Sequence, residues 1–127
     1  MGQYGNAAIR ATELVSENPA LSTQDAWDAA IKECSDCIES QKKVCPRKAY
    51  LGLCEAGVVR GIQSGGFAGK SANGEYAVRA YELLLSDPSL VKNKGLLWRS
   101  VNANAKHENG QMDVVISLWE HRLLEDS

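Results

Sequence analysis

The sequence lacks the features that mark a membrane protein, a secreted protein or a generally basic nucleic-acid-binding protein. Its hydrophobic stretches are interrupted within about ten residues, whereas a membrane-spanning helix needs about 20. The N-terminus, MGQYGNAAIRATE, has no basic segment leading into an apolar one, so no signal peptide is predicted. The formal net charge is −2. We therefore expect a cytoplasmic protein with no membrane contact, for which nucleic acid is an unfavoured partner.

Proline is also scarce, with three residues in 127, and the chain contains four cysteines. Without an export signal the cysteines are expected to be reduced thiols. Hydrophobic residues make up 44% and charged residues 24%, as in ordinary globular proteins. At this length the chain is predicted to form a single domain, residues 1–127, with a core that needs neither a disulfide nor a metal.

Strand-like alternation is absent too, and the chain contains an internal repeat. Residues 5–21, GNAAIRATELVSENPAL, align without a gap with residues 74–90, GEYAVRAYELLLSDPSL, and eight of the 17 positions are identical. Trp27 then matches Trp98, and YLGLCEAGVV (50–59) matches VISLWEHRLL (115–124). We predict an all-α fold of about six helices in two related three-helix halves, 3–62 and 72–125, with a glycine-rich connector, 61–74.

Capping residues and prolines predict where the helices begin and end. The first helix should stop before Asn18-Pro19, and its counterpart before Asp87-Pro88. The second should begin at Ser22 or Thr23, with an apolar stripe formed by Trp27, Ala30, Ile31, Cys34 and Ile38. The third should begin at Cys45-Pro46, end at Gly57 and lie centrally. The remaining three are predicted at about 73–86, 94–106 and 111–124.

Four basic residues cluster at the predicted start of the third helix: Lys42, Lys43, Arg47 and Lys48. Unpaired N–H groups at a helix start favour anions, so these residues are candidates for binding an anionic ligand. LCEAGVVRGI and the following glycines also suggest the recognition helix and wing of a winged-helix DNA-binding domain, with Val59 in the hairpin. The duplicated helices argue against that alternative, because VISLWEHRLL has no wing after it.

Cys45 lies within the same basic cluster and is the one plausible nucleophile. Cations and a helix start both favour a thiolate, so we expect Cys45 to be the most reactive cysteine. A structural zinc site usually has two close pairs of cysteines, but the four cysteines here include only one. We therefore expect Cys34, Cys37, Cys45 and Cys54 to serve packing and not to bind a metal. Neither a metal nor a cofactor is predicted.

The last helix is apolar over much of its circumference. Met112, Val115, Ile116 and Trp119 lie on one face, with further apolar residues beside them. A face this wide would leave an exposed patch on a monomer, so these residues are candidates for a homodimer interface. The alternative is that helices of the same chain cover it.

The stretch QKKVCPRKAYLGLCEAGVVRGI, with AVRAYELL and QMDVVISLWE, resembles a family of small uncharacterised bacterial helical proteins, a domain of unknown function. The resemblance implies a bacterial, single-domain, cytoplasmic protein and no particular activity. Our leading hypothesis is a non-enzymatic, self-associating protein-interaction module. The alternatives are a binder of an anionic ligand or nucleic acid through residues 42–48, and a thiol-dependent enzyme using Cys45.

Overall fold

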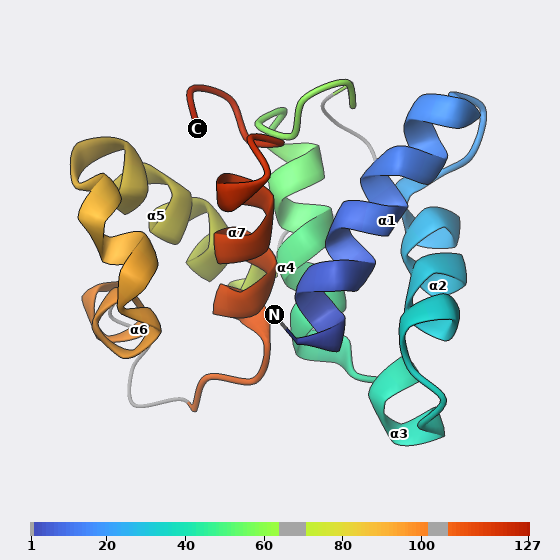
Figure 1. Cartoon of the computed structure of the whole chain (residues 1–127), viewed down its shortest axis with the longest axis horizontal. Helices are drawn as coiled ribbons and strands as arrows, with labels where there is room; N and C mark the ends of the chain where they lie inside the picture. Colours follow the sequence, from blue (N-terminus) through green and yellow to red (C-terminus); the bar gives the residue numbers. More distant parts are fainter. Residues whose placement is uncertain (1, 64–70, 102–106) are drawn as a thin grey trace.

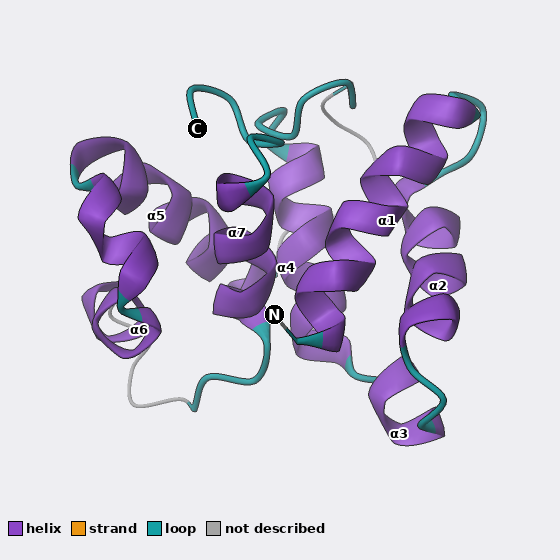
Figure 2. Cartoon of the chain, viewed as in Figure 1, coloured by secondary structure: helices purple, strands orange, loops and turns teal. Residues whose placement is uncertain are grey.

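A computed structural model describes residues 2–63, 71–101 and 107–127. These residues form helices and no strand, which confirms the all-α class (Figure 2). In chain order the elements are α1 (Gln3–Glu17), α2 (Thr23–Cys34), α3 (Ile38–Gln41), α4 (Val44–Glu55), α5 (Ala72–Ser86), the 3-10 helix η1 (Pro88–Lys92), α6 (Lys94–Val101) and α7 (Gln111–Glu120). Two short elements, α3 and η1, were not predicted. None of the described helices is long and apolar enough to cross a membrane.

Most helix ends agree with the local signals in the sequence. α1 ends at Glu17 and α5 at Ser86, each followed by the residue that precedes a proline. At the start of α2, the Ser22 hydroxyl accepts a hydrogen bond from the Asp25 N–H. Gly57 follows α4 with a φ of 78°, the left-handed conformation expected of a glycine after a helix.

Two predicted helix boundaries were wrong, and one lies partly outside the described residues. α2 ends at Cys34, because Ser35 is extended and its Oγ accepts a hydrogen bond from the Cys37 N–H at 3.2 Å. Ile38 therefore begins α3 with 62% of its surface exposed and does not extend the buried stripe of α2. α7 ends at Glu120, not 124. α6 is described only to Val101, and the rest of its predicted extent, 102–106, lies outside the described residues.

The two central helices, α4 and α7, lie against each other in the middle of the molecule (Figure 1). α1 and α2 pack on one side of this pair, while α5 and α6 pack on the other. α1 contacts α7, and α5 contacts α4, so each half's first helix packs on the third helix of the other half. The core between them contains fully buried large side chains, among them Trp27, Tyr50, Leu53, Leu84, Leu97 and Leu118. The central position predicted for α4 is confirmed.

The segments that follow α4 and α7 meet in an antiparallel bridge between Val59 and Leu124. The Arg60 N–H donates to the Leu123 carbonyl and the Glu125 N–H donates to the Val58 carbonyl, each at 2.8 Å. In the repeat alignment Val59 corresponds to Leu124, so the bridge joins equivalent positions. The arrangement in two related halves and their superposition stay predictions. Val59 pairs with the other half, so it does not form the wing of a winged-helix domain.

Candidate functional site

A groove of about 470 Å³ lies between α4 and the first turns of α5. The two helices cross in close contact at Gly52 and Gly74, where a Cβ on Gly52 would overlap the Gly74 backbone. A Cβ on Gly74 would lie 3.1 Å from the Gly52 Cα. Glycine at both positions is therefore what allows the helix backbones to form the floor of the groove. The lining residues are Gly52, Glu55, Ala56, Ser71, Gly74, Glu75, Val78 and Arg79.

Two carboxylates and one guanidinium are the ionisable groups of this α4–α5 groove among the residues that the structure describes. Among the described residues, the side-chain carboxylates of Glu55 and Glu75 form no hydrogen bond and no ion pair. Arg79 donates from Nη1 to the Val101 carbonyl at 3.2 Å and pairs with no carboxylate in the described parts of the chain. Ser71 Oγ accepts from the Gly74 N–H at 3.0 Å and caps α5. Within the described part of the chain, the two carboxylates thus have no partner.

The equivalent crossing, between α1 and α7, has larger side chains at three aligned positions. Gly5 corresponds to Gly74, and a Cβ on Gly5 would overlap the side chain of Ser117, the counterpart of Gly52. Ala56 of the groove likewise corresponds to the larger His121, and Val78 corresponds to the larger Ile9. Smaller residues at three equivalent positions therefore explain why the α4–α5 crossing has room for a ligand.

Each of the two crossings has an arginine at the same aligned position, Arg10 and Arg79, but the two arginines have different partners. In the first half, Arg10 Nε lies 3.0 Å from Glu33, and its Nη1 lies 3.3 Å from Glu13 and 3.7 Å from Glu17. In the second half, Arg79 has Ser86 at the position that corresponds to Glu17. The carboxylates around Arg10 are part of a surface network, whereas those beside Arg79 in the groove are not bound to it.

The basic residues predicted as an anion site lie together at the start of α4, but they are not equivalent. Arg47 is bound to Asp28 of α2, with Nε to Oδ1 at 2.9 Å and Nη2 to Oδ2 at 3.3 Å. Lys42, Lys43 and Lys48 are exposed and form no ion pair with a described residue. Lys43 is the N-cap of α4 and makes no side-chain capping bond. Anion binding by these residues stays a prediction, with Arg47 already neutralised by Asp28.

The thiol predicted to be reactive, Cys45, is partly buried in the first turn of α4. The exposed cysteine is instead Cys37, which precedes α3. Its pKa is lowered by hydrogen bonds from the Ser40 backbone and hydroxyl and from the Glu39 backbone. Burial raises the pKa of Cys34, and it raises that of Cys54 to about 12. Across the described ranges, no group of three or more His, Cys, Asp or Glu side chains could hold a metal ion.

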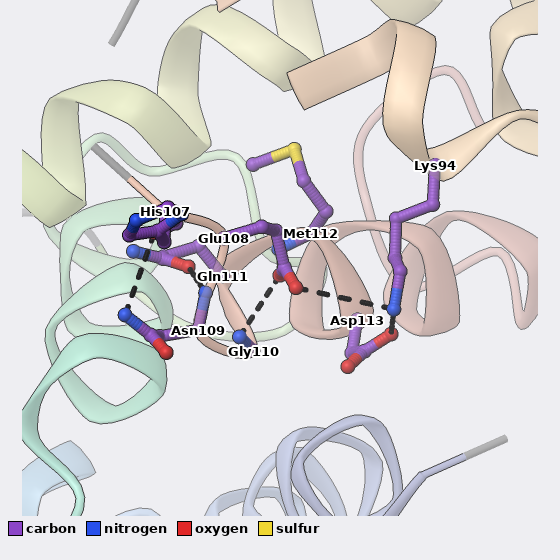
Figure 3. Close-up of polar contacts among 8 residues, drawn as sticks. All are labelled: Lys94, His107, Glu108, Asn109, Gly110, Gln111, Met112 and Asp113. Atoms are coloured by element: carbon purple, nitrogen blue, oxygen red, sulfur yellow. Dashed lines mark hydrogen bonds and ion pairs between the residues drawn. The ribbon is translucent and has the colours of Figure 1, made fainter. Parts of the chain in front are cut away.

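Polar contacts at the start of α7 hold helices together, as Figure 3 shows. Glu108 Oε2 accepts from the N–H groups of Gly110 and Met112, both at 2.9 Å, and so caps the helix. Lys94 Nζ lies 3.2 Å from Asp113 Oδ1 and 3.9 Å from Glu108 Oε1, which links α6 to α7. Because the contacting groups bind one another, we assign this cluster to the fold.

The residues predicted to form a dimer interface on α7 are mostly covered by their own chain. Met112, Val115 and Ile116 are buried, at 0%, 0% and 4% exposure. Trp119 is partly exposed and its ring centroid lies 6.4 Å from that of Tyr81. Met112, Val115 and Ile116 therefore do not form an exposed apolar face, because α1, α4 and α5 pack around α7.

The α4–α5 groove was not predicted from the sequence. The repeat alignment nevertheless contains its signal, since Gly52, Ala56 and Val78 are each smaller than the aligned residue of the other half. These differences in side-chain size indicate a groove only when it is known that α4 and α5 cross at these positions.

Comparison with known proteins gives one match. The family model described as "Family of unknown function (DUF6979)" matches residues 1–125. No curated protein and no solved structure matches the chain. The family match agrees with the domain of unknown function expected from the sequence.

Proposed function

The chain belongs to DUF6979, a family of unknown function, and from the α4–α5 groove we propose that it is a non-enzymatic interaction module that binds a basic side chain of a partner polypeptide. The observation that carries this proposal is the pair of carboxylates, Glu55 and Glu75, that line the groove without a cationic partner among the described residues. A lysine or arginine side chain supplies the missing charge.

The dimensions and surface of the groove support a polypeptide side chain as the ligand. Its volume of about 470 Å³ lies within the range of 300–1,000 Å³ typical of ligand sites. The glycine floor and Val78 offer apolar contact to the methylene stem of a lysine or arginine, while the carboxylates contact its charged end. Arg79 donates to the neutral Val101 carbonyl and keeps its positive charge, so the two carboxylates and this guanidinium leave the described lining with a net negative charge.

The experiment is a titration of the protein with a capped Gly-Arg-Gly-Arg-Gly peptide, followed by amide chemical shifts in NMR spectra. We expect shifts at Gly52, Ala56, Gly74 and Val78 on addition of this peptide. The Glu55→Gln/Glu75→Gln double variant should bind about tenfold more weakly, because both charge-assisted contacts are lost. Glu82→Gln, an exposed change on the same helix, is the matched control and should leave the affinity unchanged.

An acidic peptide, Gly-Glu-Gly-Glu-Gly, separates this proposal from the anion-site alternative. Shifts confined to residues 42–48 with the acidic peptide, and none in the groove with the basic one, would show that the basic start of α4 is the binding site. Equal binding of the basic peptide by the wild type and the double variant would contradict the role of the carboxylates.

A further inference from the structure

At the opposite end of α4 from the groove, the chain exposes a patch that is both apolar and basic. Ile38 is 62% exposed and Val44 is 53% exposed, two of the most exposed large hydrophobic side chains in the described residues. Ile38 and Val44 are separated by a single turn. This turn is closed by the hydrogen bond from the Lys42 N–H to the Ile38 carbonyl at 3.1 Å. We call Ile38, Lys42, Lys43, Val44 and Lys48 the basic corner.

The lysines of the basic corner are not neutralised by their surroundings. Arg47 is bound to Asp28, but Lys42, Lys43 and Lys48 have no ion pair within the described residues. One acidic side chain, Glu39, lies on the same turn, so the corner retains a net positive charge. An exposed apolar pair surrounded by unpaired lysines is suited to a partner surface that is acidic and partly apolar.

The molecule itself carries such a surface in the α4–α5 groove. Glu55 and Glu75 have no ion pair among the described residues and outweigh the single positive charge of Arg79, while Ala56 and Val78 supply apolar contact. Within the described residues of one molecule, no ion pair joins the lysines of the corner to Glu55 or Glu75. Val44 and Glu55, the first and last residues of α4, lie about 16 Å apart along the helix axis at 1.5 Å per residue. Two copies can bring them together.

We propose that the groove binds the basic corner of a second copy of this chain, so that the molecules associate head to tail. This inference rests on the function proposed for the groove, because it names the polypeptide that supplies the basic side chain. The two surfaces lie at different ends of α4, so one molecule uses both at once. Such a contact is heterologous and produces chains or rings.

Charge reversal on each surface tests the pairing. The protein is examined by sedimentation velocity from micromolar to millimolar concentration, as wild type, as Glu55→Lys/Glu75→Lys and as Lys42→Glu/Lys43→Glu. We expect the wild type to associate as concentration rises and each variant alone to associate at least about tenfold more weakly, since attraction becomes repulsion. An equimolar mixture of the two variants should associate again, because each reversed surface then meets its complement.

Reversals outside both surfaces, Glu82→Lys and Lys92→Glu, are the controls and should associate like the wild type. Circular dichroism confirms that each variant is folded. A wild type that stays monomeric at every concentration, while the basic peptide still binds the groove, overturns this inference and leaves the proposed function intact. Association that survives both reversals, or a mixture that fails to associate, also overturns it. Failure of the basic peptide to bind refutes the proposed function itself.

Discussion

At the scale of single residues, the four cysteines differ in exposure and in the hydrogen bonds that their sulfur atoms receive. Cys37 is exposed, and the N–H groups of Ser40 and Glu39 and the Ser40 hydroxyl stabilise its thiolate. Gln3 of α1 donates from Nε2 to Ser40 Oγ at 2.9 Å, which orients the Ser40 hydroxyl as a donor. Cys45 has cationic neighbours in the sequence, but Arg47 is turned toward Asp28. The reactivity predicted for Cys45 from its basic neighbours stays a prediction.

Iodoacetamide should consequently react with Cys37 before the other three cysteines in the native protein. The thiolate is the reactive form, and a lowered pKa in an exposed group increases its population near neutral pH. Cys54, whose pKa is raised to about 12 by burial, should react only on unfolding. Mass spectrometry of peptides labelled over time at several pH values measures each rate.

The control for this prediction is Ser40→Ala, which removes a hydroxyl donor and should slow the labelling of Cys37 near neutral pH. If Cys45 is labelled first, the expectation made from its basic sequence context is correct and the structural ranking of the thiols is wrong.

At the scale of secondary structure, the contact between α4 and α5 depends on glycine at a place where glycine is otherwise unfavourable. Glycine within a helix costs about 1 kcal/mol relative to alanine. At Gly52 that cost is offset, because α5 approaches so closely that a Cβ would overlap the Gly74 backbone. At Gly95 in α6, a Cβ would meet nothing closer than Arg99 Nη1 at 3.7 Å. The same substitution should therefore have opposite effects at the two sites.

We predict that Gly52→Ala lowers the free energy of unfolding by about 1–3 kcal/mol, because α4 and α5 must separate. Gly95→Ala should raise it by up to about 1 kcal/mol through helix propensity alone. Urea denaturation followed by circular dichroism measures both values. A stabilising Gly52→Ala would mean that the helices can move apart without cost and that the groove floor is not tightly packed.

At the scale of the whole molecule, the two halves are not independent units. α1 packs on α7 and α5 packs on α4, so each half covers the core of the other. The bridge between Val59 and Leu124 adds backbone hydrogen bonds at the same junction. A half on its own would expose the apolar face of its third helix.

Two fragments, residues 1–63 and 71–127, should therefore each be largely unfolded alone and regain helix on mixing. The physical reason is that each fragment lacks the helix that buries its apolar surface. Circular dichroism at 222 nm, the usual helical band, compares the mixture with the sum of the separate fragments. A fragment that is fully helical and unfolds cooperatively by itself would show that its half is an independent domain.

The sequence alone determined the class of the fold and most of its helices. Helical periodicity, the Ser22 cap and the prolines after Asn18 and Asp87 act within a few residues, so they can be recognised without a structure. The unbroken apolar run of α4 likewise indicated its central place, which burial of Tyr50, Leu51 and Leu53 confirms. The family match supports the resemblance at the level of a domain of unknown function.

Only the tertiary structure decided which surfaces remain available for binding. Ile38 became exposed because hydrogen bonds around Ser35 end α2 early, and Arg47 was neutralised by an aspartate 19 positions away. The apolar width of α7 suggested a dimer, but neighbouring helices of the same chain cover Met112, Val115 and Ile116. The α4–α5 groove exists because glycines from the two halves meet at a helix crossing. Each of these outcomes depends on residues brought together by packing, and local sequence patterns do not specify those contacts.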